Sequence, residues 1–213
     1  MTARAASHLS VPGARSTRGL ILNLALFQLG WWALVLSAAQ GQPLIGLAVV
    51  ALILAWHLGF VRPLASEALL IGLAALIGLS FDSLLIATGW VSFGPPAPVA
   101  SQALGVATHP VLASASFPTT STGASLPPSW MIALWANFAT TLNLSLAGLQ
   151  SRPGLAALLG LVGGPLAYWG GAGLGAMTFV TPLPALTILA LGWALLTPLL
   201  LALAATLARR SNP

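Results

Sequence analysis

The chain has 213 residues, of which 58% are hydrophobic and only 4% are charged, and its mean hydropathy is +0.97. Soluble domains carry about 25% charged residues, so this composition excludes a water-exposed globular surface and predicts an integral membrane protein. The net charge of +5 comes from seven scattered Arg residues that form no basic patch, which argues against nucleic-acid binding, and the absence of cysteine excludes disulfides, thiol catalysis and Cys-ligated metals.

The N-terminal part combines a basic leader with an apolar segment. Residues 1–19 are rich in Arg and small polar residues, and we expect a disordered cytoplasmic leader. The apolar segment Leu20–Ala39 is long enough to span a bilayer. A cleaved signal peptide is the alternative, because the segment ends in small residues. Its length and its polar residues Asn23 and Gln28 favour a retained span.

Two further spans follow, and the second of them carries an acid. The segment Pro43–Phe60 is apolar, and the segment Ala68–Val91 contains Asp82, one of only two acidic residues in the chain. A carboxylate at such depth costs at least about 2.5 kcal/mol, so it must meet a partner or stay protonated. We therefore expect the other helices to enclose Asp82. The second acid, Glu67, is expected at the wetted start of the helix, where the helix dipole favours it.

The second half of the chain begins with a long polar segment. Residues 92–128 are rich in Pro, Ser and Thr, lack helical periodicity and predict a long flexible loop. Three apolar segments follow, and we expect each of them to span the membrane. They are Ser129–Leu149, Gly154–Gly173 and residues 182–208.

The fifth of the six predicted spans, Gly154–Gly173, contains Gly163, Gly164 and Pro165 at mid-depth. Because Pro lacks a backbone donor, this sequence predicts a kink or break in the helix. The glycines favour close packing against a neighbouring helix. The alternative is a broken helix that lines a site, as in transporters.

Six spans place both termini on the same side of the membrane, with residues 20–208 as the bundle and residues 209–213 as a tail. Every Arg then falls on that side, and the positive-inside rule makes it the cytoplasm. The sequence therefore predicts an all-α, polytopic bundle of six transmembrane helices with both termini cytoplasmic. The absence of Lys and the high content of Ala, Leu, Gly and Pro indicate a bacterial source, so we expect the inner membrane. The residues that set this orientation are Arg4, Arg15, Arg18, Arg62, Arg152, Arg209 and Arg210.

Polar residues acquire approximate depths when about 1.5 Å is counted for each helical residue. Asp82, Asn137, Thr141 and Tyr168 fall at a similar level in the outer half, and we expect them to form one buried polar cluster. A second group lies nearer the cytoplasm, with Gln28 between the two levels, and its members are Asn23, His57 and Asn143. The alternative role of the Asn and Thr residues is ordinary hydrogen bonding between helices.

Tryptophans concentrate near the ends of the predicted spans, where such rings commonly anchor a helix at the membrane interface. The residues interpreted in this way are Trp31, Trp32, Trp56, Trp90, Trp130 and Trp169. His57, next to Trp56, is either interfacial too or active in proton transfer.

Four segments together resemble a known family. They are Asn23–Trp32, Gly78–Ser83, Pro128–Trp135 with Thr140–Asn143, and Gly163–Gly170. The chain is similar to the bacterial inner-membrane family called domain of unknown function 2878 over nearly all of the sequence after Arg18. This resemblance implies a small multi-span protein without an assigned activity. In that family, neighbouring genes for cyclopropane-type fatty-acid modification point to membrane lipids.

The function predicted from these features is non-enzymatic. We expect a protein that handles a lipid or a small apolar molecule, or supports membrane-lipid modification, with no cofactor and no metal. Its partners would be membrane lipids and other lipid-modifying membrane proteins. Asp82 would be the polar centre, hydrogen-bonded to Asn137 and Tyr168. The alternatives are an intramembrane enzyme that modifies acyl lipids through Asp82 and His57, and a proton-coupled transporter that uses Asp82.

Overall fold

The computed structural model of the protein describes residues 16–61, 63–93 and 126–210. These residues form six helices, a short 3₁₀ turn at Ala147–Leu149 and two three-residue strands. In chain order the elements are α1 (Thr17–Ala39), α2 (Pro43–Phe60), α3 (Leu64–Ala87), β1 (Val91–Phe93), α5 (Ser129–Ala139), α6 (Pro153–Gly173), β2 (Met177–Phe179) and α7 (Pro182–Arg210).

Five of these helices have the length and composition of membrane spans. Helices α1, α2, α3, α6 and α7 contain 23, 18, 24, 21 and 29 residues, with mean hydropathies between 1.4 and 2.3. About 20 apolar residues suffice to cross the hydrocarbon core of a bilayer. The described part of the chain is therefore a mainly helical, multi-pass membrane protein, which confirms the predicted class.

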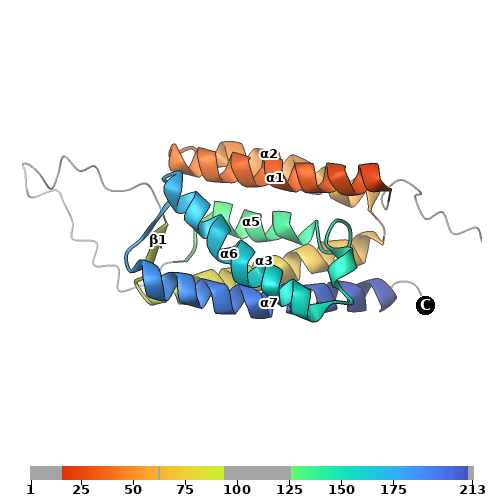
Figure 1. Cartoon of the computed structure of the whole chain (residues 1–213). Helices are drawn as coiled ribbons and strands as arrows, with labels where there is room; N and C mark the ends of the chain where they lie inside the picture. Colours follow the sequence, from red (N-terminus) through yellow and green to blue (C-terminus); the bar gives the residue numbers. More distant parts are fainter. Residues whose placement is uncertain (1–15, 62, 94–125, 211–213) are drawn as a thin grey trace, which may run out of the picture.

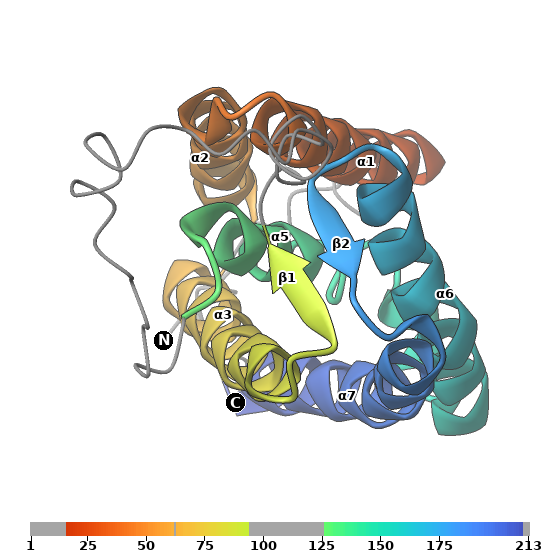
Figure 2. The same cartoon turned by 90° about the vertical axis from the view of Figure 1, so that its left-hand side faces the viewer.

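The five long helices surround the shorter α5. Viewed along the bundle, the ring runs α2, α1, α6, α7, α3, with α5 inside it (Figure 2). Helix α5 packs directly against α1, α2 and α3. The outer faces of the ring carry exposed apolar side chains, including Ile21, Leu44, Leu84 and Leu195. Such a surface suits acyl chains, whereas the ring shields the polar residues of α5 from them.

The predicted fourth span, Ser129–Leu149, is not one long helix. Helix α5 ends at Ala139 after 11 residues, which gives about 16 Å, roughly half of a hydrocarbon core. The hydroxyls of Thr140 and Thr141 bond back to the carbonyls of Asn137 and Phe138, over 2.7 and 2.6 Å. Side chains of this kind compete with helical hydrogen bonding, and turns follow up to the 3₁₀ segment.

The two strands close one end of the bundle. Strands β1 and β2 pair antiparallel, with Val91 opposite Phe179, and lie across the end of the ring (Figure 2). The predicted third span therefore ends earlier than Val91. Gly89 has a φ of 71°, a left-handed conformation that commonly terminates a helix directly after its last turn.

Other helix boundaries differ little from the predictions. Helix α2 has the predicted bounds Pro43–Phe60. Helix α1 starts at Thr17 instead of Leu20, because the Ser16 hydroxyl caps it by accepting a hydrogen bond from the Gly19 N–H. Helix α7 continues to Arg210, so the predicted tail begins inside a helix. Residues 1–15 of the predicted leader, residues 94–125 of the predicted loop, Arg62 and residues 211–213 lie outside the described ranges.

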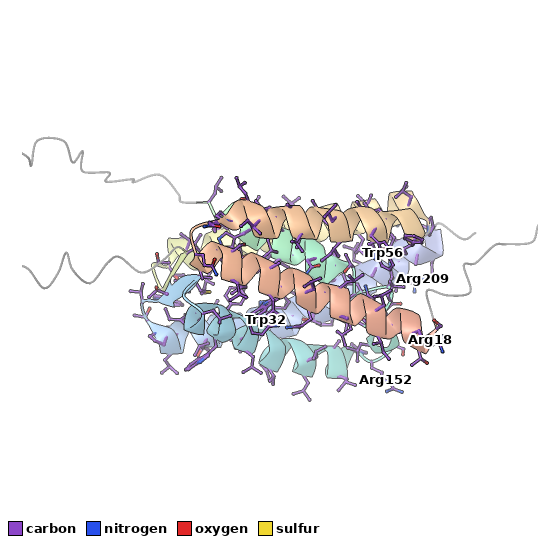
Figure 3. The ribbon with its side chains drawn as sticks, turned by 90° about the horizontal axis from the view of Figure 1, so that it is seen from above. Arg18, Trp32, Trp56, Arg152 and Arg209 are labelled. Carbon is purple, nitrogen blue, oxygen red and sulfur yellow. The ribbon has the colours of Figure 1, made fainter. Side chains whose placement is uncertain are left out.

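The two ends of the bundle differ in charge. Both the start of α1 and the end of α7 lie at the end opposite the strands (Figure 1). The side chains of Arg18, Arg152 and Arg209 gather at this same end (Figure 3). We refer to it below as the Arg end.

Candidate functional site

Asp82 is enclosed between three helices. Its side chain, on α3, is 0% exposed. The indole N–H of Trp135, on α5, donates to Asp82 Oδ2 over 2.8 Å, and the hydroxyl of Tyr168, on α6, donates to Asp82 Oδ1 over 2.5 Å. Both carboxyl oxygens therefore accept a hydrogen bond within the protein, which is what an acid at membrane depth requires.

Gly78 makes the approach of Trp135 possible. A Cβ atom on Gly78 would lie 2.0 Å from Cγ of Trp135, a distance that real side chains do not reach. Gly78 and Asp82 are four residues apart and so share a face of α3. Together they position the indole of Trp135: Gly78 leaves room for the ring, and the Asp82 carboxylate accepts a hydrogen bond from its N–H. Phe81 packs edge-on against the same ring, with centroids 6.2 Å apart.

A second tryptophan supports the first from α7. The indole rings of Trp135 and Trp193 are stacked, with centroids 4.5 Å apart and planes at 13°. Trp193 in turn fits against two glycines of α6. A Cβ atom on Gly164 would lie 2.2 Å from Cγ of Trp193, and one on Gly160 would lie 2.1 Å from its carbonyl oxygen.

The predicted helix break is absent. Helix α6 runs continuously from Pro153 to Gly173 with Pro165 inside it. A Cβ atom on Gly163 would meet nothing within 4 Å, whereas Gly164 faces Trp193. Gly164 therefore serves the packing of α6 against α7, the first of the two predicted roles, whereas Gly163 does not.

Asn137 and Thr141 do not contact Asp82. Asn137 is two residues from Trp135, about 200° around the helix, and so faces the opposite side of α5. Its Nδ2 donates to the carbonyl of Phe27 over 2.9 Å, and it packs against Gly30 of α1. Thr141 lies beyond the end of α5, so the two residues do not share a helix face. Of the predicted cluster, the structure brings only Tyr168 to Asp82.

Trp135 is the partner that the sequence analysis missed. The estimated depth along the spans favoured Asn137 as the partner of Asp82, because these two residues lie at a similar level. The spacing of Gly78 and Asp82 on one face of α3 was the available signal, since it offers a large ring both space and an acceptor.

A cavity borders the two aromatic members of this hydrogen-bonded group, Trp135 and Tyr168. Its volume is about 70 Å³, which is room for about five groups of water or methylene size. Trp135 and Tyr168 form part of its wall, and the other lining residues are almost all apolar or aromatic. They are Phe27, Trp31, Val35, Trp130, Met131, Leu134, Phe138, Ala167, Gly171, Met177 and Trp193.

The site residues fall within one sequence family. A family model described as "Protein of unknown function (DUF2878)" matches residues 20–199. The chain belongs to this family. The matched range includes α2, α3, α5, α6 and both strands, and with them Asp82, Trp135 and Tyr168. Comparison with curated proteins and with solved structures finds no match.

The second predicted polar group of this DUF2878 protein divides into two parts. Asn23 Nδ2 donates to the carbonyl of Thr140 over 3.1 Å, and Asn23 Oδ1 accepts from the Ser145 hydroxyl over 2.7 Å. Gln150 donates to the carbonyl of Leu142 over 3.0 Å. These side chains satisfy the non-helical backbone after α5, which is tolerated at membrane depth only inside protein. Gln28 is exposed on α1.

The other part of the group contains an acid that was expected elsewhere. Glu67 is only 3% exposed, so the prediction of a wetted headgroup position is wrong. The fourth residue of α3 faces the bundle, where Glu67 Oε2 lies 3.2 Å from Nε2 of His57. Glu67 Oε1 accepts a hydrogen bond from Asn143 over 2.7 Å, and Gln150 donates to Asn143 over 3.0 Å.

The predicted interfacial tryptophans also divide. Trp32, Trp56 and Trp169 are exposed on the outside of the DUF2878 bundle, as an anchoring role requires. Trp130 is 5% exposed and lines the cavity with Trp31. The sequence could not separate these two sets, because residues near a span end face lipid or protein according to the rotation of the helix.

The positions of the titratable groups limit the chemistry. Asp82 and Glu67 are fifteen residues apart on α3, which corresponds to about 22 Å. His57 contacts Glu67, so Asp82 and His57 are too far apart to share one proton-transfer step. Among the described residues, no three His, Cys, Asp or Glu side chains come together in a way that could hold a metal ion.

Proposed function

We propose that this protein holds the end of a lipid acyl chain in the aromatic cavity beside Asp82, as a binding protein that supports membrane-lipid modification. The observation that carries this proposal is the cavity itself, an almost wholly apolar space inside a membrane protein. Its walls offer large ring surfaces for dispersion contacts with methylene groups.

The surroundings of the cavity support a lipid as the occupant. Its walls include residues of α1 and α6, which are neighbours in the ring (Figure 2). The backbones of these two helices make little direct contact, unlike those of α1 and α2 or of α6 and α7. The ring of Trp31 fills part of this gap, since a Cβ atom on Gly170 of α6 would lie 3.3 Å from it. We infer that an acyl chain enters between α1 and α6, beside this ring. An entrance on this side would open to the acyl chains around the bundle, not to water.

Asp82 would act through the cavity wall. It is not itself among the lining residues, but it holds the rings of Trp135 and Tyr168, which are. Its hydrogen bonds restrict two large side chains to one arrangement. Binding then costs less ordering of the wall, which is the usual benefit of preorganisation. This role needs no proton transfer and favours a binding protein over an enzyme.

Cross-linking with a lipid that carries a photoreactive group at its acyl terminus tests the proposal. The purified protein would be placed in bilayers that contain this lipid, irradiated and analysed by mass spectrometry. We expect labels on cavity residues such as Met131 and Met177, in addition to the outer faces of the helices.

A matched pair of variants on α6 makes the test specific. Gly171 lines the cavity, and a Cβ atom there meets only Met177 at an ordinary 3.7 Å, so the rest of a leucine would occupy the cavity in Gly171→Leu. Gly163→Leu, where a Cβ atom meets nothing within 4 Å, is the control. We expect Gly171→Leu to lose at least about 90% of the cavity labelling, an apparent affinity loss of about 1.4 kcal/mol, and Gly163→Leu to keep it. Labels confined to outer faces in the wild type would refute the proposal.

A further inference from the structure

A buried His–Glu pair lies far from the cavity, near the Arg end. His57 Nε2, on α2, and Glu67 Oε2, on α3, are 3.2 Å apart, and the two side chains are 1% and 4% exposed. Ionisable groups inside membrane bundles are rare and commonly mark proton or ion pathways. Neither His57 nor Glu67 lines the cavity or bonds to Asp82, Trp135 or Tyr168.

Each end of the pair has a distinct environment. Glu67 has both oxygens occupied, since Asn143 donates to Oε1 over 2.7 Å. His57 does not: its Nδ1 is buried and has no hydrogen-bond partner among the described residues. When Nε2–H donates to the carboxylate, Nδ1 carries a free lone pair. This nitrogen therefore has the capacity to accept a proton, next to a carboxylate that balances the added charge.

The neighbouring elements contribute few other charges. The segment after α5 supplies only the amides Asn143 and Gln150 to the Glu67 side. From α7, which packs against α3, the charged groups Arg209 and Arg210 are exposed, and Arg209 bonds to Thr206. From α1, which packs against α2, the charged group is the exposed Arg18. Among the described titratable groups, Glu67 therefore contacts His57 alone.

We propose that His57 and Glu67 form a proton-binding site that exchanges one proton with the solution at the Arg end. In the unloaded state a neutral imidazole donates Nε2–H to the Glu67 carboxylate, and the pair carries one negative charge. A hydronium ion then transfers its proton to His57 Nδ1 and leaves as water. The product is an imidazolium–carboxylate pair without net charge, and loss of the Nδ1 proton to water restores the first state.

The position of His57 gives this exchange a short path. His57 lies in the last turn of α2, which ends at Phe60, and the chain turns there toward α3 at the Arg end (Figure 1). A transient water needs to cross only about one helical turn, roughly 5 Å, to reach this level of the bundle. The site is independent of acyl-chain binding and does not require it.

Nuclear magnetic resonance of the imidazole tests the site directly. The full chain, labelled at histidine and carrying H8Q and H109Q so that only His57 reports, would be titrated from about pH 5 to about pH 9 in detergent micelles. We expect the ring signals of His57 to move between two limiting positions. A signal that holds one position over the whole range overturns the proposal, and this measurement needs no change at the pair.

Variants then test whether the two residues act together. In Glu67→Gln the midpoint of the His57 transition should move to lower pH by at least about one unit, because the imidazolium has lost its carboxylate partner. Ser80→Ala is the matched control on the same helix, since the exposed Ser80 hydroxyl donates to the Leu76 carbonyl one turn earlier, and it should leave the midpoint in place. If Glu67→Gln does not fold, Asn143→Leu, which removes the donor to Oε1, should shift the midpoint instead. A wild-type midpoint in a folded Glu67→Gln protein, or in Asn143→Leu where that protein does not fold, would refute a shared site.

Discussion

A single carboxylate holds two aromatic side chains at the centre of the protein. Asp82 accepts from an indole N–H and from a phenol O–H, and both rings then form part of a cavity wall. Burial of this acid is unfavourable on its own, but each partner also brings a polar hydrogen into the apolar interior. Loss of the carboxylate leaves both ring donors without an acceptor, whereas loss of either ring leaves one carboxyl oxygen without a donor.

Substitution of Asp82 should therefore destabilise the protein in a graded way. Asp82→Leu leaves the N–H of Trp135 and the O–H of Tyr168 without acceptors, at about 1–3 kcal/mol for each buried group. Asp82→Asn keeps one acceptor oxygen, and its loss of stability should be about half as large. Thermal unfolding in detergent measures both, with Ser80→Ala as the control on α3. An Asp82→Leu protein that melts with the wild type would show that these hydrogen bonds contribute nothing to the fold.

At the scale of whole elements, the sequence predicted five of six segments well and the site only in part. Apolar length alone located the long helices, because hydrocarbon thickness sets that length. The short α5 escaped this reasoning, since leucines continue through the turns after it, at Leu142, Leu144 and Leu146. The run of Thr140, Thr141 and Asn143 was the overlooked signal, because such side chains favour local bonds to the backbone. Whether Trp135 or Asn137 contacts Asp82 depends on the rotation of α5 about its axis, and depth along the span does not determine that rotation.

The packing of α6 against α7 gives a prediction from two adjacent glycines. Gly164→Ala would put a Cβ atom 2.2 Å from Cγ of Trp193, whereas Gly163→Ala would meet nothing within 4 Å. Overpacking of this kind costs about 1–3 kcal/mol, so Gly164→Ala should unfold at a lower temperature. Gly163→Ala should be neutral or stabilising by up to about 1 kcal/mol, because alanine favours a helix more than glycine. Equal unfolding temperatures would mean that Trp193 moves aside without loss.

The whole molecule has two different ends, and their charges argue for one orientation. Arg18, Arg152 and Arg209 lie at the end opposite the strands (Figure 3). Helix α5 and the turns after it connect the strand end to the Arg end, so the segment would act as a sixth crossing although it is not one helix. We infer that the Arg end faces the cytoplasm of a bacterial cell, by the positive-inside rule, and that the strands face outward.

Single cysteines would report this orientation without interference, because the natural chain contains none. Ser151 and Thr178 are both exposed, the first next to Arg152 at the Arg end and the second in β2. In spheroplasts whose cytoplasmic membrane is intact, a membrane-impermeant maleimide should label Thr178→Cys and leave Ser151→Cys unlabelled. Ser151→Cys should react only after the membrane is opened with detergent, which also proves that its thiol is accessible. The reverse pattern would invert the protein in the membrane. It would also place the His57–Glu67 pair near the outer face, where the proton it exchanges would come from outside the cell.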